Sequence, residues 1–317
     1  MTKPRIAVLA DYYSRAASFA RWSDATFADF SFFDEAIESE DSLVEALADF
    51  NAVGLMRERT PFTASLIERL PKLELIITSG KKNAAIDVAA AQRCGITVCG
   101  TESPGYATAE LAFLLVMSLN RQLVPLVNAL KQEGDWQPVM GRDLRGRTLG
   151  ILGLGRLGRQ LAGFAQAMGM HVTAWSENLT PDDCVASDVR YVSRAELFEG
   201  ADTVSIHLRH SSRTNHMVGL EDLRRLGEEG YLVNTSRAEI VDPAGLKEAL
   251  DNAFIAGAAT DVFYKEPADR NDWMASHPRI LTTPHIGYCT EETFEIFYQQ
   301  MLEGFEAYYS GSPVRVI

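Results

Sequence analysis

The sequence predicts an α/β protein with two doubly wound parallel sheets joined by long helices. Short β-branched runs alternate with helical patterns along nearly the whole chain, and this alternation is typical of parallel sheets covered by helices. A glycine-rich turn after a long helical stretch begins a second alternating series. With 317 residues, the chain is long enough for two domains of ordinary size.

The first series predicts helices between four strands. One helix is expected over Ser42–Phe50, where Ser42 and Glu45 form a Ser-x-x-Glu capping pattern. Two more are expected over Thr63–Leu70 and over Ile86–Cys94, the last ended by a glycine. The strand candidates are Arg5–Ala10, Ala52–Met56, Leu73–Ser79 and Ile96–Cys99.

A long helical stretch separates the two series. It runs over Thr108–Arg121 and, after Pro125, on to Glu133. A final helix over Glu291–Tyr309 is expected to cross back onto the first unit and make that domain discontinuous. The strand candidates of the second series are Thr148–Leu152, His171–Trp175, Thr203–Leu208, Tyr231–Thr235, Ile255–Ala259 and Ile280–Thr283.

Composition excludes several classes of protein. A formal net charge of −13 argues against a nucleic-acid partner, because a phosphate backbone needs a concentrated basic face. The longest apolar run, Leu111–Leu119, is too short to span a bilayer, and the first residues lack signal-peptide architecture. The four cysteines lack metal-ligand spacing, so no metal is expected, and Cys94 and Cys99 are expected to be packed thiols. We therefore expect a cytoplasmic protein.

The glycine turn predicts a dinucleotide site. Gly153, Gly155 and Gly158 form G-x-G-x-x-G between a strand-like run and a helix-like run. The first glycine permits the tight turn, the second lets a pyrophosphate approach the backbone, and the third lets helix and strand pack closely. The following helix presents free N–H groups to the phosphates. The alternative, a strand–turn–helix without a ligand, fits this context less well.

The end of the next strand bears on the choice of cofactor. An acidic residue about 20 positions after the turn binds the adenosine ribose in such sites. Here Ser176 occupies the position where the acid would sit, and Glu177 follows it. No Arg or Lys lies nearby in the sequence to receive a 2′-phosphate. This favours NAD over NADP, although Glu177 could equally be a solvated loop charge.

Three polar residues follow strands of the second series. Arg237, Glu266 and His285 each lie just past a predicted strand, and ligands of open α/β sheets bind beyond the carboxyl ends of the strands. Each alone is more typical of a loop residue. Together, after a dinucleotide turn, they fit hydride transfer between nicotinamide and a carbonyl beside a carboxylate. Arg237 would hold the carboxylate and stabilise the carbonyl oxygen, His285 would transfer the proton, and Glu266 would orient His285.

At these residues the sequence resembles the D-isomer-specific 2-hydroxyacid dehydrogenase family. That family includes phosphoglycerate, glycerate, D-lactate and formate dehydrogenases and glyoxylate/hydroxypyruvate reductases. The matching segments occur in the family's order and spacing, over essentially the whole chain. They are Leu149–Gly158, Val233–Arg237, Thr260–Pro267 and Thr283–Gly287.

The resemblance implies roles for further residues. Arg237, Glu266 and His285 would be the catalytic residues of an oxidoreductase acting on a small 2-oxo or 2-hydroxy acid. Ser79 and Gly80 would lie at the centre of a loop whose backbone amides receive the substrate carboxylate, with Lys81 beside them. The remaining positions would contact the dinucleotide; these are Thr108, Arg156, Leu157, His207, Thr235, Asp261 and Gly287.

The resemblance also implies an organisation. Residues 1–102 with 290–317 would form the substrate-binding domain and residues 103–289 the dinucleotide-binding, Rossmann-like domain. Family members are typically homodimers. Arg57 resembles the position where phosphoglycerate dehydrogenases place a cation near the substrate, and a solvent-facing arginine is an equal alternative. The serine at position 176 departs from the family's usual aspartate and weakens the NAD assignment.

Two other functions remain open from the sequence. The family's transcriptional co-repressors keep the same three polar residues and sense dinucleotide without turnover, but the chain has no basic surface or disordered tail of the kind expected for partner docking. Similar proteins also oxidise phosphite with an Arg–Glu–His set. The leading hypothesis is the D-2-hydroxyacid dehydrogenase.

Overall fold

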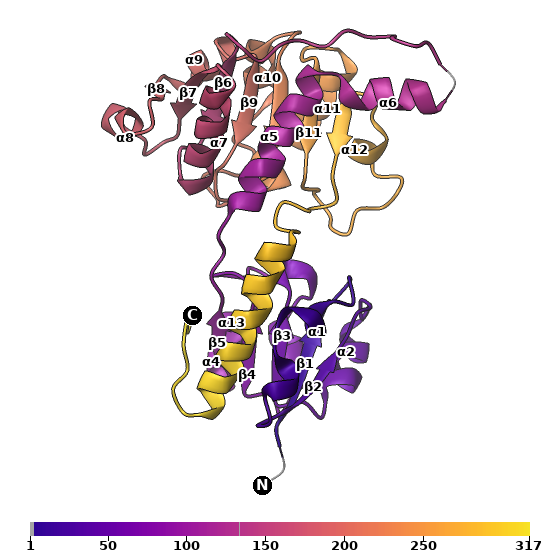
Figure 1. The fold of residues 1–317 in the computed structure, drawn as a ribbon, viewed down its shortest axis with the longest axis vertical. Coiled ribbons are helices and arrows are strands. Elements are labelled where there is room, and N and C mark those ends of the chain that lie inside the picture. Colours follow the sequence, from indigo (N-terminus) through magenta and orange to yellow (C-terminus); the bar gives the residue numbers. More distant parts are fainter. Residues whose placement is uncertain (1–2, 133) are drawn as a thin grey trace. The chain divides into compact units, whose positions relative to one another are not determined.

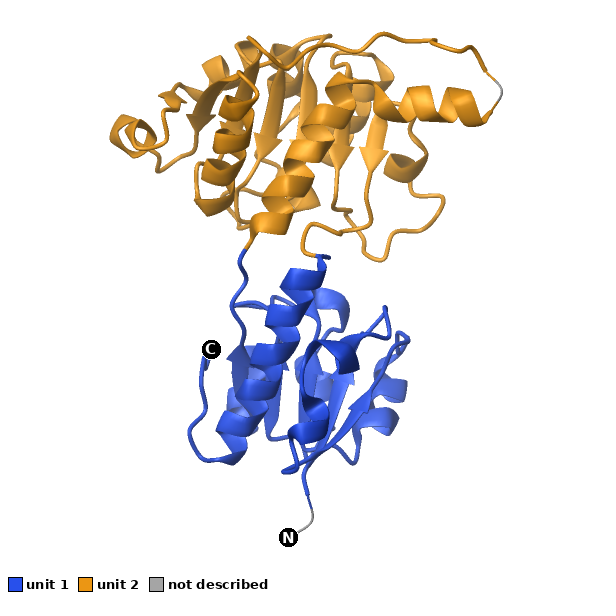
Figure 2. Cartoon of the chain, viewed as in Figure 1, with its two compact units in different colours: residues 1–104, 289–317 blue, residues 105–288 orange. Residues whose placement is uncertain are grey.

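The computed structural model describes residues 3–132 and 134–317 and contains two parallel β-sheets (Figure 1). The chain divides into two compact units (Figure 2). Unit 1 comprises residues 1–104 and 289–317, and unit 2 comprises residues 105–288. The predicted fold class, two doubly wound α/β units, is confirmed.

Unit 1 contains a five-stranded sheet in the order β2-β1-β3-β4-β5. The chain order reverses between β1 and β3, and in open α/β sheets ligands bind outside the carboxyl ends of the strands at such a switch point. The strands are β1 (Arg5–Leu9), β2 (Asp29–Phe32), β3 (Ala52–Leu55), β4 (Leu75–Thr78) and β5 (Thr97–Gly100).

Helices cover both faces of this sheet (Figure 1). On one face Leu43, Leu66 and Ala90 pack with strand residues in a single apolar cluster. On the other face the final helix approaches so closely that a side chain at Gly54 would meet the Met301 sulfur. The elements are α1 (Ala16–Phe19), η1 (Trp22–Asp24), α2 (Glu40–Leu47), η2 (Arg57–Arg59), α3 (Ala64–Glu68), α4 (Val88–Arg93) and α13 (Glu291–Tyr309).

The start of α2 corrects the sequence prediction. The helix begins at Glu40, and the Ser39 hydroxyl accepts a hydrogen bond from the Ser42 N–H. Ser42 is therefore inside the helix, and the predicted Ser42–Glu45 capping pattern is wrong. The physical reason is that a serine followed by two acidic residues in the first turn makes a stronger helix start.

Unit 2 contains a seven-stranded sheet in the order β12-β11-β10-β9-β6-β7-β8. Here the chain order reverses between β6 and β9, so the glycine turn that follows β6 lies at the switch point. The strands are β6 (Thr148–Leu152), β7 (His171–Trp175), β8 (Arg190–Tyr191), β9 (Thr203–Ile206), β10 (Tyr231–Asn234), β11 (Gly257–Thr260) and β12 (Ile280–Thr282).

Two apolar clusters fill the space between this sheet and its helices. α5 and α7 lie on one face, and α9, α10 and α11 lie on the other (Figure 1). The helices and turns are α5 (Tyr106–Asn120), α6 (Leu123–Lys131), α7 (Arg156–Ala167), α8 (Pro181–Val185), α9 (Arg194–Glu199), α10 (Leu220–Leu226), η3 (Ala238–Ile240), α11 (Pro243–Asp251) and α12 (Trp273–Ser276).

The break between α5 and α6 lies earlier than predicted. Gln122 has a left-handed φ of 53°, and Pro125 lies inside the first turn of α6, where a missing N–H costs nothing. The predicted end at Glu133 lies outside the described residues. In the described part of the chain no single helix could span a membrane; α5 and α6 meet the length and hydropathy criteria only as a pair bent by 66°.

The two strands that the sequence analysis did not predict lie at sheet edges. β2 alternates polar and aromatic residues and is only half-buried, and β8 is a pair of exposed residues. Such edge strands lack the continuous apolar run of a buried parallel strand. Cys99 is buried, but Cys94 is exposed at the end of α4, so the prediction of two packed thiols is wrong for Cys94.

Candidate active site and dinucleotide turn

Five residues directly follow parallel strands of unit 2, at the carboxyl edge of the sheet. They follow β6, β9, β10, β11 and β12, whose ends are aligned by the register of the ladders. Because parallel strands all end at the same edge, these residues form one row. They are Gly153, His207, Thr235, Asp261 and Thr283.

Asp261 holds the loop that carries His285. Its side chain is buried and accepts hydrogen bonds from the Thr283 hydroxyl at 2.6 Å, the Ile286 N–H at 2.8 Å and the Gly287 N–H at 2.7 Å. Burial raises the pKa of this carboxyl, and these three donors oppose the rise. Asp261 therefore fixes the backbone on both sides of His285.

The same loop packs tightly against the start of α5. The Thr108 hydroxyl donates to the Gly287 carbonyl at 2.8 Å. A Cβ at Gly287 would lie 3.0 Å from an Asp261 oxygen and 3.3 Å from the Thr108 methyl. A residue with a side chain at position 287 would thus push the His285 loop away from both anchors.

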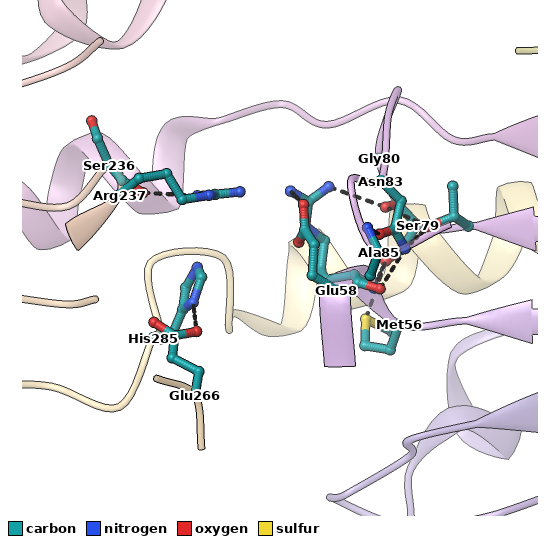
Figure 3. Close-up of polar contacts among 12 residues, drawn as sticks. Met56, Glu58, Ser79, Gly80, Asn83, Ala85, Ser236, Arg237, Glu266 and His285 are labelled. Carbon is teal, nitrogen blue, oxygen red and sulfur yellow. Dashed lines mark hydrogen bonds and ion pairs between the residues drawn. The ribbon is translucent and has the colours of Figure 1, made fainter. Parts of the chain in front are cut away.

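Glu266 and His285 form a close pair (Figure 3). The Glu266 Oε2–His285 Nδ1 distance is 2.5 Å, and Oε1 accepts a hydrogen bond from the Phe263 N–H at 2.9 Å. Burial alone would raise the pKa of Glu266, but the hydrogen bonds to His285 and Phe263 and the charges of His285 and Arg237 outweigh it and lower the pKa. An ionised Glu266 keeps a proton on Nδ1 and leaves Nε2 for chemistry.

His285 itself adopts a backbone conformation that few residues other than glycine adopt, with φ at 54°. Such conformations cost roughly 1–3 kcal/mol and persist where the surroundings enforce them. The Asp261 hydrogen bonds at Ile286 and Gly287 provide that enforcement. The strain identifies the loop as a positioned element of the fold.

Arg237 lies at the end of β10 in a fixed backbone. The Asn234 side chain donates to the Arg237 carbonyl at 2.9 Å, and the Ser236 hydroxyl donates to the Ile206 carbonyl at 2.7 Å. The guanidinium donates to the Ser236 carbonyl at 2.7 Å (Figure 3). Its charge also lowers the pKa of Glu266. The structure thus brings Arg237, Glu266 and His285 into one electrostatic group.

The glycine turn has the geometry that its three glycines predict. Gly153 has a φ of 105°, and a Cβ there would lie 2.8 Å from the His207 carbonyl oxygen. A Cβ at Gly158 would lie 2.3 Å from the Gly153 oxygen, whereas a Cβ at Gly155 would meet nothing within 4 Å. The first and third glycines are required by packing, and the second leaves open space at the start of α7.

Two buried polar atoms beside this turn lack partners among the described residues. They are His207 Nδ1 and Thr235 Oγ1. The other His207 nitrogen, Nε2, lies 2.9 Å from the Ser205 hydroxyl. A buried polar group without a hydrogen bond costs about 1–3 kcal/mol, so a polar ligand at this edge would remove a cost that the chain otherwise bears. A nicotinamide dinucleotide, with its ribose and carboxamide groups, fits that requirement.

His207 predicts a pH dependence of stability. Burial lowers the pKa of His207 to about 4, below its unfolded value of about 6.5. The unfolded chain therefore binds a proton at a higher pH than the folded chain. The contribution of His207 to the free energy of unfolding is fully present above pH ~6.5 and is lost as the pH drops toward 4, a loss of about 2–3 kcal/mol.

The measurement is guanidinium-induced unfolding of the dinucleotide-free protein at neutral and at acidic pH. His207→Asn should reduce the loss of stability between the two conditions, whereas His210→Asn, at an exposed histidine, should leave it unchanged. An equal pH dependence in wild type and His207→Asn would contradict the buried neutral imidazole.

The other predicted dinucleotide residues lie around the turn. Arg156 and Leu157 are the first two residues of α7, and both side chains approach the backbone at Gly105. Ser176 is half-buried and Glu177 is exposed just past β7.

The structure also places a cation that sequence spacing did not predict. The Arg194 guanidinium lies 5.9 Å from the Trp175 ring, next to Ser176. It is paired with Asp222 at 2.6 Å. No Arg or Lys lies near Ser176 in the sequence, but in the structure Arg194 lies near the end of β7. Its charge is already paired with that of Asp222.

In unit 1 the predicted carboxylate loop needs a correction. The Ser79 N–H donates to the Leu55 carbonyl at 2.9 Å, and the Gly80 N–H donates to the Thr101 hydroxyl at 2.7 Å. Neither amide is available to a ligand. Within the described residues, the N–H groups of Lys81 and Lys82 donate no hydrogen bond. Amides without a partner in this loop therefore follow Ser79 and Gly80 in the chain, and they include that of Lys82, which the sequence analysis did not name.

Ser79 and Gly80 instead help to position Arg57. The Ser79 hydroxyl accepts from the Arg57 N–H at 2.8 Å, and the guanidinium donates to the Ser79 carbonyl at 3.1 Å. A Cβ at Gly80 would lie 2.0 Å from the guanidinium. The side chain is also paired with Glu58 at 3.4 Å. Arg57 is thus a held arginine at the switch point of unit 1, which argues against the solvent-facing alternative.

The Asn83 side chain is hydrogen-bonded within this loop, whereas the Lys81 ammonium pairs outside it. The Asn83 side chain donates to the Arg57 carbonyl at 2.6 Å and accepts from the Ala85 N–H at 2.9 Å (Figure 3). The Lys81 ammonium is exposed and pairs with Glu102 at 2.8 Å. In the sequence, Lys82 is distinguished only by its position shortly after Gly80. That position does not show which amides of the loop are already paired.

Known proteins share both the sequence and the fold. The model for the D-isomer specific 2-hydroxyacid dehydrogenase NAD-binding domain matches residues 113–287. A glyoxylate reductase of Korarchaeum cryptofilum is 35% identical over 88% of this chain and 85% of its own length. A glycerate dehydrogenase of Methylorubrum extorquens is 31% identical over 93% and 95%.

A solved structure has a similar fold over nearly all of the chain. The crystal structure of a phosphoglycerate oxidoreductase from Vibrio cholerae superposes with a TM-score of 0.91 at 33% identity, covering 98% of this chain and 100% of that one. The chain therefore belongs to the D-isomer-specific 2-hydroxyacid dehydrogenase family of NAD(P)-dependent oxidoreductases.

Proposed function

We propose that this enzyme interconverts a small 2-oxo acid and its D-2-hydroxy acid, with a glyoxylate-, hydroxypyruvate- or phosphoglycerate-type substrate, and that Arg237, Glu266 and His285 are its catalytic residues. The observation that carries the proposal is the 2.5 Å Glu266–His285 pair. It lies on a strained loop that Asp261 anchors at the carboxyl edge of the sheet.

The roles follow from the geometry of unit 2. Glu266 keeps a proton on His285 Nδ1, so Nε2 is the atom that gives a proton to the substrate carbonyl oxygen during reduction and removes it during oxidation. Arg237 stabilises the negative charge that develops on that oxygen and pairs with the neighbouring carboxylate. Bound nicotinamide supplies or receives the hydride. The family's co-repressors are the alternative that turnover would exclude.

Residues around the glycine turn would hold the dinucleotide. The N–H groups of Arg156 and Leu157 point from the start of α7, where the helix dipole favours a pyrophosphate. Thr235 and His207 would give hydrogen bonds to the nicotinamide half, because each has a buried polar atom without a partner. Exposed Glu177 would repel a 2′-phosphate, which supports NAD as the preferred cofactor.

In unit 1 we assign substrate binding to the loop after β4. The amides of Lys81 and Lys82 are the available donors for a carboxylate, and Arg57 supplies a positioned positive charge nearby in the same unit. Backbone N–H groups combined with an arginine are well suited to a carboxylate. This assignment replaces Ser79 and Gly80 as the direct donors.

The experiment that tests the function is a substrate panel with both cofactors. NADH and NADPH consumption would be followed with glyoxylate, hydroxypyruvate, pyruvate and phenylpyruvate. We expect turnover of glyoxylate or hydroxypyruvate, at a higher rate with NADH than with NADPH. Tight dinucleotide binding without turnover of any acid would instead favour a sensing protein.

We also propose that the enzyme is a homodimer formed through α6 and the segment after it. α6 is rich in apolar residues, yet it has no buried residue, and a nine-residue helix needs packing to be stable in water. A second copy presents the same apolar face, and a two-fold contact between identical faces is self-complementary. The exposed apolar side chains are Leu123, Val124, Val127, Leu130, Trp136, Val139 and Met140.

This surface gives a prediction about oligomeric state. The substitution Leu130→Asp places a charge on a side chain that is 62% exposed in the single chain. It should shift the protein from dimer to monomer in sedimentation velocity, because a buried unpaired charge is costly. Val185→Asp, at an exposed apolar residue that ends α8, should leave the dimer intact. A wild-type monomer at micromolar concentration would contradict the proposal.

A cytoplasmic location is the last part of the proposal. All four cysteines are free thiols, which fits a reducing compartment. Cell fractionation followed by immunodetection would test it, and recovery in the membrane or secreted fraction would contradict it.

A further inference from the structure

The turn that follows β3 places a carboxylate beside the loop to which the proposed function assigns the substrate. The turn, η2, begins one residue after the strand and consists of Arg57, Glu58 and Arg59. The Arg57 and Glu58 side chains are 21% and 27% exposed. A half-buried acidic side chain is unexpected in a site for anionic substrates, because like charges repel.

The Arg57 guanidinium connects Glu58 to the loop after β4. Its Nη1 donates to the Ser79 carbonyl at 3.1 Å, and a Cβ at Gly80 would lie 2.0 Å from this nitrogen. Its Nη2 lies 3.4 Å from Glu58 Oε1. The Glu58 carboxylate is therefore separated from the loop backbone by one guanidinium group, a span comparable to the length of a substituted three-carbon acid (Figure 3).

Two positive charges beside this loop are already compensated by carboxylates. Arg57 pairs with Glu58, and the Lys81 ammonium pairs with Glu102 at 2.8 Å. Water and salt screen the half-buried Arg57–Glu58 pair less than they screen an exposed pair. A substrate with one carboxylate can be bound by the backbone amides of the loop. A second anionic group on that substrate would lie against the carboxylates that hold these cations.

Arg59, the other arginine of the turn, is directed toward the end of β1. Its guanidinium donates to the Ala10 carbonyl at 3.1 Å and lies 4.5 Å from the centre of the Tyr12 ring. Arg57 instead extends to the loop after β4. The charged side chains that meet at this loop from η2 are thus those of Arg57 and Glu58.

We infer that Glu58 is a specificity-determining residue, which disfavours 2-oxo acids with a second anionic group and favours those with an uncharged hydrogen-bond donor on the third carbon. The inference rests on the proposed function, in which the loop after β4 receives the substrate carboxylate. A carboxylate accepts a hydrogen bond from a hydroxyl and repels a phosphate or a second carboxylate. Glu58 therefore selects hydroxypyruvate-type substrates over phosphoglycerate-type substrates.

The test compares kcat/KM of the whole enzyme with NADH for hydroxypyruvate, pyruvate and 3-phosphohydroxypyruvate. Each value is divided by that for glyoxylate, which has no third carbon and reports turnover without a group beside Glu58. In the wild type, the ratio for hydroxypyruvate should exceed that for pyruvate by about tenfold, because a hydroxyl donates to a charged acceptor. It should exceed the ratio for 3-phosphohydroxypyruvate by at least about a hundredfold, because of charge repulsion.

Matched variants assign this discrimination to Glu58. Glu58→Gln keeps the shape and removes the charge, so the ratio for 3-phosphohydroxypyruvate should rise at least about tenfold, and that for hydroxypyruvate should fall. Glu58→Asp retains the charge and should retain the discrimination. Glu68→Gln, at an exposed glutamate at the end of α3 in the same unit, should behave as wild type.

Two results would overturn the inference while leaving the proposed function in place. They are equal ratios for hydroxypyruvate and 3-phosphohydroxypyruvate in the wild type, and an unchanged 3-phosphohydroxypyruvate ratio in Glu58→Gln. A wild-type enzyme that reduces neither glyoxylate nor hydroxypyruvate would overturn the proposed function, and this inference with it.

Discussion

Replacing His285 with alanine should reduce the rate of 2-oxo acid reduction by about 10²–10⁴-fold while leaving dinucleotide affinity nearly unchanged. The imidazole is the proton donor in the proposed reaction, and its Nδ1 is already committed to Glu266 at 2.5 Å. No other histidine occurs in the segment that Asp261 anchors. Steady-state kinetics would give kcat and KM, and fluorescence titration with NADH would give the cofactor affinity.

The controls separate proton transfer from loop structure. Glu266→Gln keeps an oxygen that accepts from His285 Nδ1 but removes the charge that stabilises the protonated ring, so its loss in kcat should be smaller than that of His285→Ala. His210→Ala alters an exposed histidine after β9 and should not change turnover. Near-normal turnover in His285→Ala would refute the acid–base assignment, and a native circular dichroism spectrum with retained NADH binding is the check that the variant is folded.

Replacing Arg237 with alanine should lower kcat/KM by about 10²–10³-fold, the range found when a preorganised donor to a developing oxyanion is removed. The backbone around Arg237 is held by Asn234 and Ser236, so the substitution should leave the fold in place. The guanidinium also lowers the pKa of Glu266, so in the variant activity should be lost at a higher pH on the acid side as Glu266 becomes protonated.

Arg237→Lys is the sharper comparison. It keeps the positive charge but loses the planar, two-pronged donor set that matches a carboxylate. Activity should therefore recover only in part. Arg279→Ala, at an exposed arginine elsewhere in unit 2, should behave as wild type. An unchanged kcat/KM in Arg237→Ala would remove Arg237 from the mechanism and leave the His285 assignment standing.

Some regular elements of the fold could be predicted with their observed bounds. β6, β7 and α13 have the predicted bounds, because each has a sustained apolar periodicity between clear end signals. The edge strand β8 could not be predicted, because two residues are too few to show a periodic pattern. The start of α2 could not be predicted either, because both Ser39 and Ser42 are suitable N-cap residues. The break between α5 and α6 occurs at Gln122, which has a left-handed backbone conformation. The sequence does not reveal it, because the residue there is not the glycine that usually adopts this conformation.

The dinucleotide turn was determined by the sequence alone. Two of its three glycines are dictated by backbone approach, since Cβ atoms at Gly153 and Gly158 would collide with carbonyl oxygens, whereas Gly155 leaves open space at the start of α7. The order of Arg237, Glu266 and His285 after strands was also legible, because parallel strands end at one edge. Both features depend on the local backbone, so the residue types in a short segment are enough to predict them.

The tertiary structure decided which groups are already paired. Asp261 reads in the sequence as a cofactor residue, yet both its oxygens hold the His285 loop. The sequence suggests Ser79 and Gly80 as carboxylate donors, yet their amides already donate to Leu55 and Thr101. Whether a backbone amide is free for a ligand depends on hydrogen bonds to segments far away in the sequence. Composition and spacing do not show which distant segments are in contact.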